Sequence, residues 1–343
     1  MIEKAETVHA HIRPSRVKDH VDELAQEYRV LVETLCNISE VYLFEVRLDD
    51  AIRLLNSDIL KVIEEELSPT DKVRIQIQLA KMMLYRSRLS NEGFDAALEL
   101  LFEIERIAKS LNDKGILADV VDLIGWGIMY RELSYRRPYD PALEYFEQGL
   151  DLRREIGDER GIAESLFCVG LVYEYKKDVT SADKDKALEY YQEAHRLAQE
   201  VGDKRTQSFT TRHFGWIYRH KGDLDKALAY FKESLTLREE IGHKLYLSQA
   251  YYAIGLVYYE KNDLEKAWEY YQRSYDHAEK IGLRTHVCGS LLEMGNVKKA
   301  QGEAAMALRN YQKALEVARS IAYEPGIKEA TESIEKLSGK ESE

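Results

Sequence analysis

The sequence contains few of the residues that mark several large classes of protein. Its 343 residues include only 5 prolines, 19 glycines and 3 cysteines. So few prolines and glycines argue against strand-and-turn architectures and against low-complexity disorder. Cys36, Cys168 and Cys288 have no Cys-x-x-Cys spacing, and an odd, sparse set supplies neither a zinc site nor a disulfide framework.

Basic residues and long apolar runs are also scarce. Lys and Arg number 49 against 61 Asp and Glu, a net charge of −12, and an acidic chain lacks the basic face that general nucleic-acid binding requires. No stretch approaches the ~18 consecutive apolar residues of a membrane span, and residues 1–20 contain no apolar signal segment. We therefore expect a cytoplasmic protein whose partners are neither nucleic acids nor membranes.

The most informative feature that is present is a repeat of 40 to 45 residues. In each unit a glycine is followed by an alanine and, four residues later, by an aromatic ring. The five complete sets are Gly125, Ala142 and Phe146; Gly170, Ala187 and Tyr191; Gly215, Ala227 and Phe231; Gly255, Ala267 and Tyr271; and Gly295, Ala307 and Tyr311. The pattern extends further upstream, less completely, around Ala80 and Ser39, which makes seven units.

Each unit predicts two helices. From Thr211 to Leu235, apolar and small residues recur three or four apart on both sides of Gly222–Asp223. Glycine is a typical helix stop and aspartate a typical N-cap, so this dipeptide separates the two helices. A small residue such as Gly215 also allows two crossing helices to approach closely.

This spacing resembles the tetratricopeptide repeat (TPR). In the fifth unit the pattern reads Gly215, Tyr218, Gly222, Ala227 and Phe231. The unit length and the Ile/Val-Gly-Asp linkers resemble the variety seen in kinesin light chains and bacterial regulators. The resemblance implies an all-α fold, a right-handed α-α superhelical solenoid of about seven helix pairs with capping helices at both ends.

On this basis we divide the chain into three parts. Residues 1–31 form an N-terminal extension and heptad-patterned helix, 32–323 the TPR solenoid, and 324–343 a C-terminal capping helix and frayed tail. Apolar residues from Val17 to Tyr42 alternate by four and three, as in a coiled-coil seam. This helix either covers the open end of the stack in a monomer, which we favour, or pairs with a second chain in a dimer.

No catalytic constellation is present in the sequence. There is no His-Glu-x-x-His, no phosphate-binding loop and no Gly-x-Ser-x-Gly motif. The nine histidines are scattered, and Cys168 and Cys288 fall on predicted helices as small apolar residues. We therefore expect no enzyme activity, no cofactor and no metal site.

Binding is the function that a helical stack favours, because its first helices line an extended concave surface. The resemblance to TPR implies which positions face the groove. The candidate partner-binding residues at these positions are Trp126, Tyr130, Phe167, Tyr175, Phe209, Arg212, His213, Trp216, Arg219, His220, Tyr252 and Tyr259. We predict a non-catalytic protein–protein interaction scaffold that binds a peptide or partner segment there. The alternative is a sensor or regulatory subunit whose stack closes on a small ligand or signalling peptide.

The fifth unit differs from the others in charge. Arg212, Trp216 and Arg219 share one helix face, and two guanidiniums beside an indole can hold a carboxylate or phosphate. This favours an acidic or phosphorylated partner segment. Alternatively, the arginines pair with carboxylates such as Glu174 or Glu260, or the composition is incidental. Protonation of the two histidines of this helix near pH ~6 would strengthen anion binding.

Overall fold

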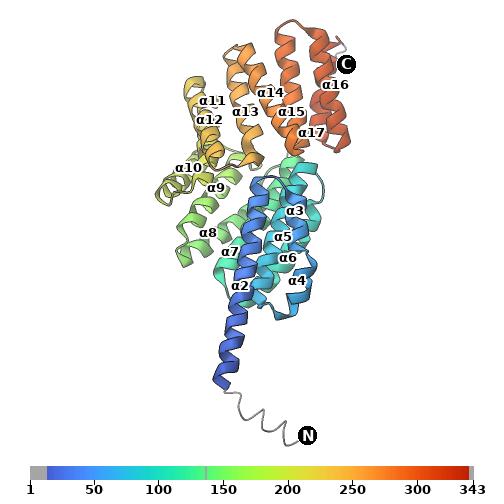
Figure 1. Cartoon of the computed structure of the whole chain (residues 1–343). Coiled ribbons are helices and arrows are strands. Elements are labelled where there is room, and N and C mark those ends of the chain that lie inside the picture. Colours follow the sequence, from blue (N-terminus) through green and yellow to red (C-terminus); the bar gives the residue numbers. More distant parts are fainter. Residues whose placement is uncertain (1–13, 136, 340–343) are drawn as a thin grey trace, which may run out of the picture.

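A computed structural model describes residues 14–135 and 137–339, in which helices are joined by short turns and no strand occurs (Figure 1). The helices, in chain order, are α2 (Pro14–Phe44), α3 (Leu48–Leu55), α4 (Asp58–Ile63), η1 (Glu64–Glu66), α5 (Pro69–Ser90), α6 (Phe94–Leu111), α7 (Lys114–Ser134), η2 (Asp140–Ala142), α8 (Leu143–Ile156), α9 (Glu159–Tyr175), α10 (Ser181–Glu200), α11 (Lys204–His220), α12 (Leu224–Glu240), η3 (Lys244–Tyr246), α13 (Leu247–Glu260), α14 (Leu264–Ile281), α15 (Arg284–Ala300), α16 (Ala304–Ser320) and α17 (Glu324–Leu337). None of the described helices is both long enough and apolar enough to cross a membrane.

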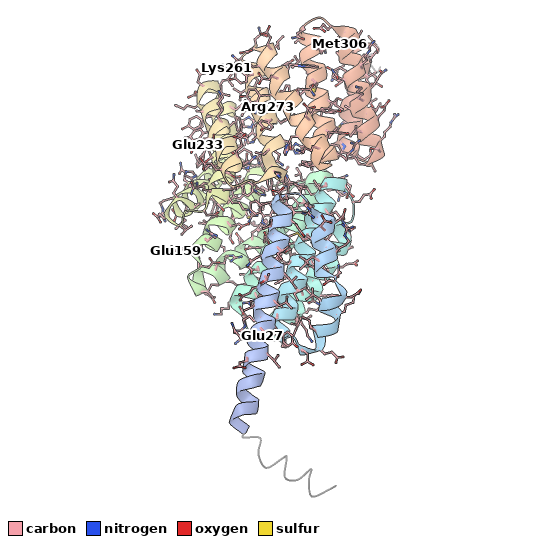
Figure 2. All side chains as sticks on the ribbon, in the orientation of Figure 1. Glu27, Glu159, Glu233, Lys261, Arg273 and Met306 are labelled. Carbon is pink, nitrogen blue, oxygen red and sulfur yellow. The ribbon has the colours of Figure 1, made fainter. Side chains whose placement is uncertain are left out.

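The predicted right-handed solenoid of helix pairs is confirmed. Its pairs are α2/α3, α5/α6, α7/α8, α9/α10, α11/α12, α13/α14 and α15/α16, and α17 covers the last pair. The helices end where the sequence indicates: Gly222, between the two helices of a pair, and Gly242, after the second, adopt the left-handed backbone conformation with φ +78° and +66°. Acidic side chains such as Glu159 and Glu233 project from the outer surface (Figure 2).

The contact between the two helices of each pair follows the predicted register. The repeated rings Phe146, Tyr191, Phe231, Tyr271 and Tyr311 are 0–1% exposed. Each lies against the glycine of the preceding helix, and a Cβ placed on Gly215 would stand 2.6 Å from the Phe231 ring. Since real Cβ atoms do not approach carbon so closely, only glycine permits this crossing.

The N-terminal helix is longer than one repeat requires. α2 runs without a break through both the heptad-patterned segment and the first helix of the first pair. Val32 and Leu43 are buried, and this half of α2 packs on α3 and α5, whereas Leu24 is 38% exposed. The N-terminal half extends away from the other helices (Figure 1). The predicted extension up to residue 13 and the last four residues of the tail lie outside the described residues.

Units far apart in the sequence touch one another, whereas in an open solenoid each unit contacts only its neighbours. The hydroxyls of Tyr130 and Tyr246 lie 3.1 Å apart, and the amide of Asn91 donates to the carbonyl of Ile321 over 3.4 Å. Lys244 forms an ion pair with Glu45. The superhelix therefore curls until its N-terminal units meet units five to seven, a rotation that a 40-residue period by itself does not specify.

We predict that Gly215→Ala destabilises the protein while Gly289→Ala does not. The added methyl group at residue 215 forces the Phe231 ring to move, an overpacking that typically costs about 1–3 kcal/mol. The same change at Gly289 meets only Tyr252, at 3.8 Å, so the higher helix propensity of alanine should leave stability unchanged or raise it by up to ~1 kcal/mol. Urea denaturation of both variants measures the difference. Equal stabilities would contradict the assigned crossing.

Candidate binding cavity

The first helices of the pairs enclose a cavity of about 290 Å³. Helices α5, α7, α9, α11, α13 and α15 contribute to its wall, together with the turns before α8 and α13. The lining residues are Arg88, Trp126, Met129, Tyr130, Leu133, Tyr139, Phe167, Leu171, Tyr175, Phe209, Arg212, His213, Trp216, Tyr246, Gln249, Tyr252 and His286. The cavity is close in size to sites for small ligands or for a few residues of a peptide.

Most of the candidate partner-binding residues line this cavity. They are Trp126, Tyr130, Phe167, Tyr175, Phe209, Arg212, His213, Trp216 and Tyr252. The other three lie outside its wall. Arg219 forms an ion pair with Glu260 and lies 5.2 Å from the Trp216 ring centroid, His220 is exposed at the end of α11, and Tyr259 is partly buried. Arg219 is therefore paired across the groove with Glu260, which was the alternative to anion binding for this unit.

Several residues of the wall are absent from the candidate list, among them Arg88, Tyr139, Tyr246 and His286. Tyr246 and His286 each stand nine residues before the signature glycine of their unit, so a wider window around that glycine could have found them. Arg88 and Tyr139 carry no such signal. Arg88 lies in the last turn of the elongated first helix α5. Tyr139 belongs to an inserted segment, where its backbone N–H donates to the carbonyl of Tyr175 over 3.2 Å.

Aromatic rings form a continuous apolar surface along one side of the cavity. Phe167 stacks on Phe209 with ring centroids 5.5 Å apart, and Tyr246 meets the Phe209 ring edge-on at 4.9 Å. Trp126 and Tyr130 continue this surface, with centroids 5.3 Å apart. Flat rings that already pack against one another lose little freedom when a ligand covers them, which suits a contact surface.

Arginines without a carboxylate partner stand beside these rings. Arg238 is 0% exposed and donates from Nη1 to the Tyr246 carbonyl over 2.8 Å, but its Nε and Nη2 have no partner. Arg88 is 9% exposed and lies over the Tyr130 and Tyr246 rings, with Nη1 unpartnered. Within the described residues no ion pair forms at Arg88, Arg212 or Arg238.

His213 does not act as the pH-sensitive cation that the sequence suggested. Nη2 of Arg212 donates to its Nε2 over 2.9 Å, since arginine can only donate. The proton of the ring is therefore on Nδ1, which donates to Glu174 over 2.7 Å. Burial, reinforced by Arg212, lowers the pKa of His213 below its ordinary value even though Glu174 raises it. The residue is consequently a neutral link between a cation and an anion.

The titratable groups around the cavity indicate a positive potential. Burial and then Arg205 and Arg238 lower the pKa of His243 to about 2. Burial and then Arg88 lower the pKa of His286 to about 3. Burial alone would raise the pKa of Tyr246, but Arg88 and Arg205 bring it below its usual value. Arginine charges thus contribute to lowering the pKa of all three groups, although the whole chain is acidic.

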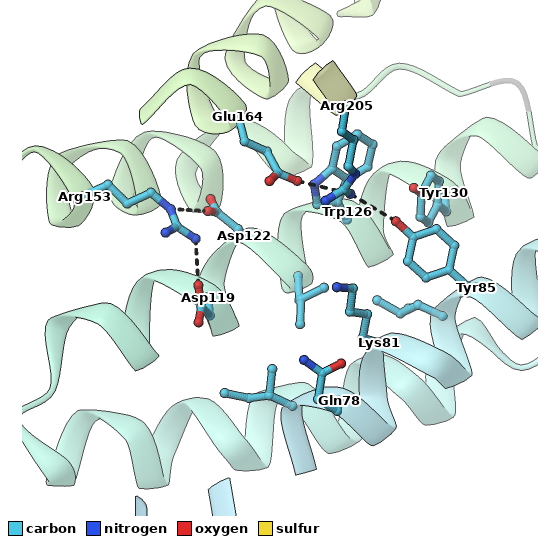
Figure 3. A pocket seen from close by; sticks show the side chains of 13 residues that line it. Gln78, Lys81, Tyr85, Asp119, Asp122, Trp126, Tyr130, Arg153, Glu164 and Arg205 are labelled. Atoms are coloured by element: carbon cyan, nitrogen blue, oxygen red, sulfur yellow. Dashed lines mark hydrogen bonds and ion pairs between the residues drawn. The ribbon is translucent and has the colours of Figure 1, made fainter. Parts of the chain in front are cut away.

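A neighbouring hollow between α5, α7 and α9 shows the opposite arrangement (Figure 3). There Arg153 donates to Asp119 and Asp122 over 2.8 and 2.9 Å, and Arg205 pairs with Glu164 at 3.3 Å. Burial raises the pKa of Asp122 to about 7, although Arg153 opposes this shift. Here each arginine is paired with a carboxylate, so we interpret the charged residues of this hollow as a structural network.

Residues 140–334 match the family described as the MalT-like TPR region, which is more than half of the chain. The chain belongs to this family. No curated protein matches its sequence. Among the described residues of this TPR chain, no group of three or more His, Cys, Asp or Glu side chains is arranged to hold a metal ion.

Several solved structures share the fold. NprR in complex with its cognate peptide NprX has a TM-score of 0.59 and 18% identity, over 92% of this chain and 89% of that one. A Rap protein complexed with Competence and Sporulation Factor has a TM-score of 0.54 and 15% identity, over 91% of this chain and 99% of that one. The third structure is a signal transduction ATPase with numerous domains (STAND) from Pyrococcus horikoshii, which has a tetratricopeptide repeat sensor. Its TM-score is 0.56 and its identity 19%, over 90% of this chain and 45% of that one. This chain thus spans less than half of the Pyrococcus protein.

We predict that His243 makes the protein less stable in acid. Its ordinary pKa is about 6.5 and its folded value is about 2, so between these values only the unfolded state binds the proton. Stability therefore falls as pH drops below ~6.5, by about 2 kcal/mol at pH 5. Urea denaturation at pH 7 and 5 should show a smaller loss for His243→Phe, which keeps the contacts with neighbouring rings.

The difference between variants is the quantity to compare, because other groups also titrate in this range. Asp122, with a pKa raised to about 7, binds a proton preferentially in the folded state and opposes the effect. The exposed His220 supplies the control, and His220→Phe should lose as much stability as the unchanged protein. Identical losses in all three proteins would show that His243 is not held neutral.

Proposed function

We propose that the protein is a non-catalytic binding protein that holds a peptide or partner segment in the cavity between its first helices. The observation that carries this proposal is the combination, in one cavity, of packed aromatic rings with arginines that have no carboxylate partner. Apolar walls with a few polar groups are typical of binding sites, and Trp, Tyr and Arg dominate binding energy at interfaces. The described part of the chain contains no enzymatic domain.

The bound segment, in this proposal, contains an acidic or phosphorylated residue flanked by apolar ones. The apolar part would lie on Phe209 and Trp216, and the anionic part would face Arg212. The binding of a peptide, though not its charge, is supported by two relatives in fold: NprR, solved with its cognate peptide NprX, and a Rap protein, solved with Competence and Sporulation Factor.

A second candidate function is that of a sensor, and a separate observation supports it. The contacts between Tyr130 and Tyr246 and between Asn91 and Ile321 join units that are more than a hundred residues apart. A ligand that binds the closed form better would shift the protein towards it. The Pyrococcus protein with a similar fold has a tetratricopeptide repeat sensor. Small-angle scattering separates the two functions: a ligand that shrinks the radius of gyration favours a sensor, and an unchanged radius favours a scaffold.

We also propose that the protein is a cytoplasmic monomer. The free thiols of Cys36, Cys168 and Cys288 suit a reducing compartment. The C-terminal half of α2 packs on its own chain, and only its N-terminal half is open to a second one. Sedimentation equilibrium of the full chain should give the monomer mass, and a dimer would favour the coiled-coil alternative.

We predict that filling the cavity weakens peptide binding. Peptides selected on the full chain from a displayed random library should bind it in calorimetry. Gln249→Trp places an indole at a lining residue without removing a core contact and should weaken those peptides at least tenfold. Gln301→Trp, at an exposed position after α15, is the matched control and should leave the affinity unchanged.

Two results would contradict the proposal. If both tryptophan variants bind the selected peptides as well as the unchanged protein does, the peptides bind elsewhere. If no sequence is enriched by selection, the cavity does not recognise peptides.

A further inference from the structure

Three arginines converge on the cavity from different parts of the chain. Arg88 comes from α5, Arg212 from α11 and Arg238 from α12. The guanidinium carbons of Arg88 and Arg238 lie 4.5 and 5.7 Å from the centroid of the same Tyr246 ring. Arg88 and Arg212 line the cavity itself, and the ring beside Arg238 lines it too.

Their charges are not balanced by the protein. Four of their N–H-bearing nitrogens are buried without a hydrogen-bond partner: Nη1 of Arg88, Nε of Arg212, and Nε and Nη2 of Arg238. Buried polar groups are normally paired, and an exception in a native fold needs an explanation. Burial, followed by the like charge of Arg212, lowers the pKa of Arg238, which means that the fold opposes this charge.

Two carboxylates that contact lining residues, Glu174 and Glu293, already have donors. Glu174 accepts from His213 over 2.7 Å and also from Tyr191. Glu293 accepts from Tyr252 over 3.0 Å and from Asn296. Neither forms an ion pair with the three arginines. Arg88 and Arg212 therefore line a cavity into which an external acceptor could enter, and Arg238 lies directly behind the Tyr246 ring of its wall.

We propose that Arg88, Arg212 and Arg238 bind an oxyanion, a carboxylate or phosphoryl group, carried by an aromatic or apolar ligand. The proposal rests on the proposed binding function and identifies the chemistry that the cavity recognises. Guanidinium groups present several donors in a fixed plane, which suits two-oxygen recognition of either group. The rings of Phe209 and Tyr246 beside them contact the apolar body of the same ligand.

The bound anion also links two distant units of the superhelix. Arg88 belongs to the second unit, whereas Arg212 and Arg238 belong to the fifth. One oxyanion held by both would bridge units two and five, beside the Tyr130–Tyr246 contact, which joins units three and six. Without it the arginines repel one another across this junction, so binding converts a repulsion into an attraction and tightens the closed form.

Three small probes test the chemistry on the full chain by calorimetry. They are N-acetylphenylalanine with a free carboxylate, its neutral amide, and N-acetylphosphotyrosine amide. At least one anionic probe should bind ten times more tightly than the neutral amide, and the tighter of the two identifies the oxyanion as carboxylate or phosphoryl. Equal binding of all three probes, or no binding of either anion, would overturn the proposal.

Variants test which arginines are responsible. Arg88→Gln and Arg212→Gln should each remove the tenfold preference for the anion. Arg219→Gln is the matched control, because Arg219 lies on the same helix as Arg212 but is paired with Glu260; it should keep the preference. Loss of the preference in the control, or its persistence in both test variants, would show that the anion binds elsewhere.

Stability and exchange supply readouts that a structural arginine would not produce. Arg238→Met removes a buried charge without a counterion, so the ligand-free Tm should stay the same or rise while the anionic probe no longer raises it. A lower Tm with the probe effect intact would overturn the role of Arg238. In the unchanged protein the probe should slow hydrogen exchange both at the end of α5 and in residues 241–247. Protection on one side only would contradict the bridge.

Failure of this inference is distinguishable from failure of the proposed function. Selected peptides that lose affinity in Gln249→Trp but show no dependence on an anionic group would leave the binding function intact and overturn the oxyanion site. If the anionic probes bind but no peptide can be selected, the oxyanion site stands and the peptide-binding function is overturned.

Discussion

The shape of the molecule depends on one contact, repeated in five of the helix pairs, in which an aromatic ring of the second helix lies on a glycine of the first. The pairs Gly125–Phe146, Gly170–Tyr191, Gly215–Phe231, Gly255–Tyr271 and Gly295–Tyr311 all have this geometry. The contact sets the depth at which two helices cross and the rotation of each first helix about its axis. Because that rotation recurs, residues at constant offsets from the glycine, such as Phe209 and Trp216, face the interior.

Contacts within one unit could be predicted from the sequence, and contacts across the superhelix could not. The period located the crossing glycines, the buried rings and the turn at Gly222, because these depend on neighbours at fixed separations. It also located much of the cavity wall, including Trp126. Arg88 and Tyr139 were missed because their place depends on how far successive pairs rotate. That rotation is the sum of many small side-chain contacts between pairs and has no signal at one position.

The two interior hollows show how differently a fold can treat buried charge. Around Arg153, each cation has a carboxylate within hydrogen-bonding distance, so desolvation is offset by pairing. Around Arg238, the guanidinium has aromatic neighbours and one carbonyl, and two of its nitrogens are unpaired. Stability alone would favour an apolar residue at that position. Local rules that a sequence breaks without compensation tend to mark functional positions, and the unpaired arginines are consistent with that rule.

The contacts between distant units also limit how many repeats this protein can gain or lose. An open solenoid can gain or lose a unit at either end and keep all its other contacts. Here the contacts of Tyr130 with Tyr246 and of Asn91 with Ile321 require a set number of units between them. Deleting forty residues from the middle would rotate one half away from the other and break both contacts together. The number of repeats is therefore constrained much as the number of blades is in a closed propeller, and variation in length is confined to the loops and the two ends.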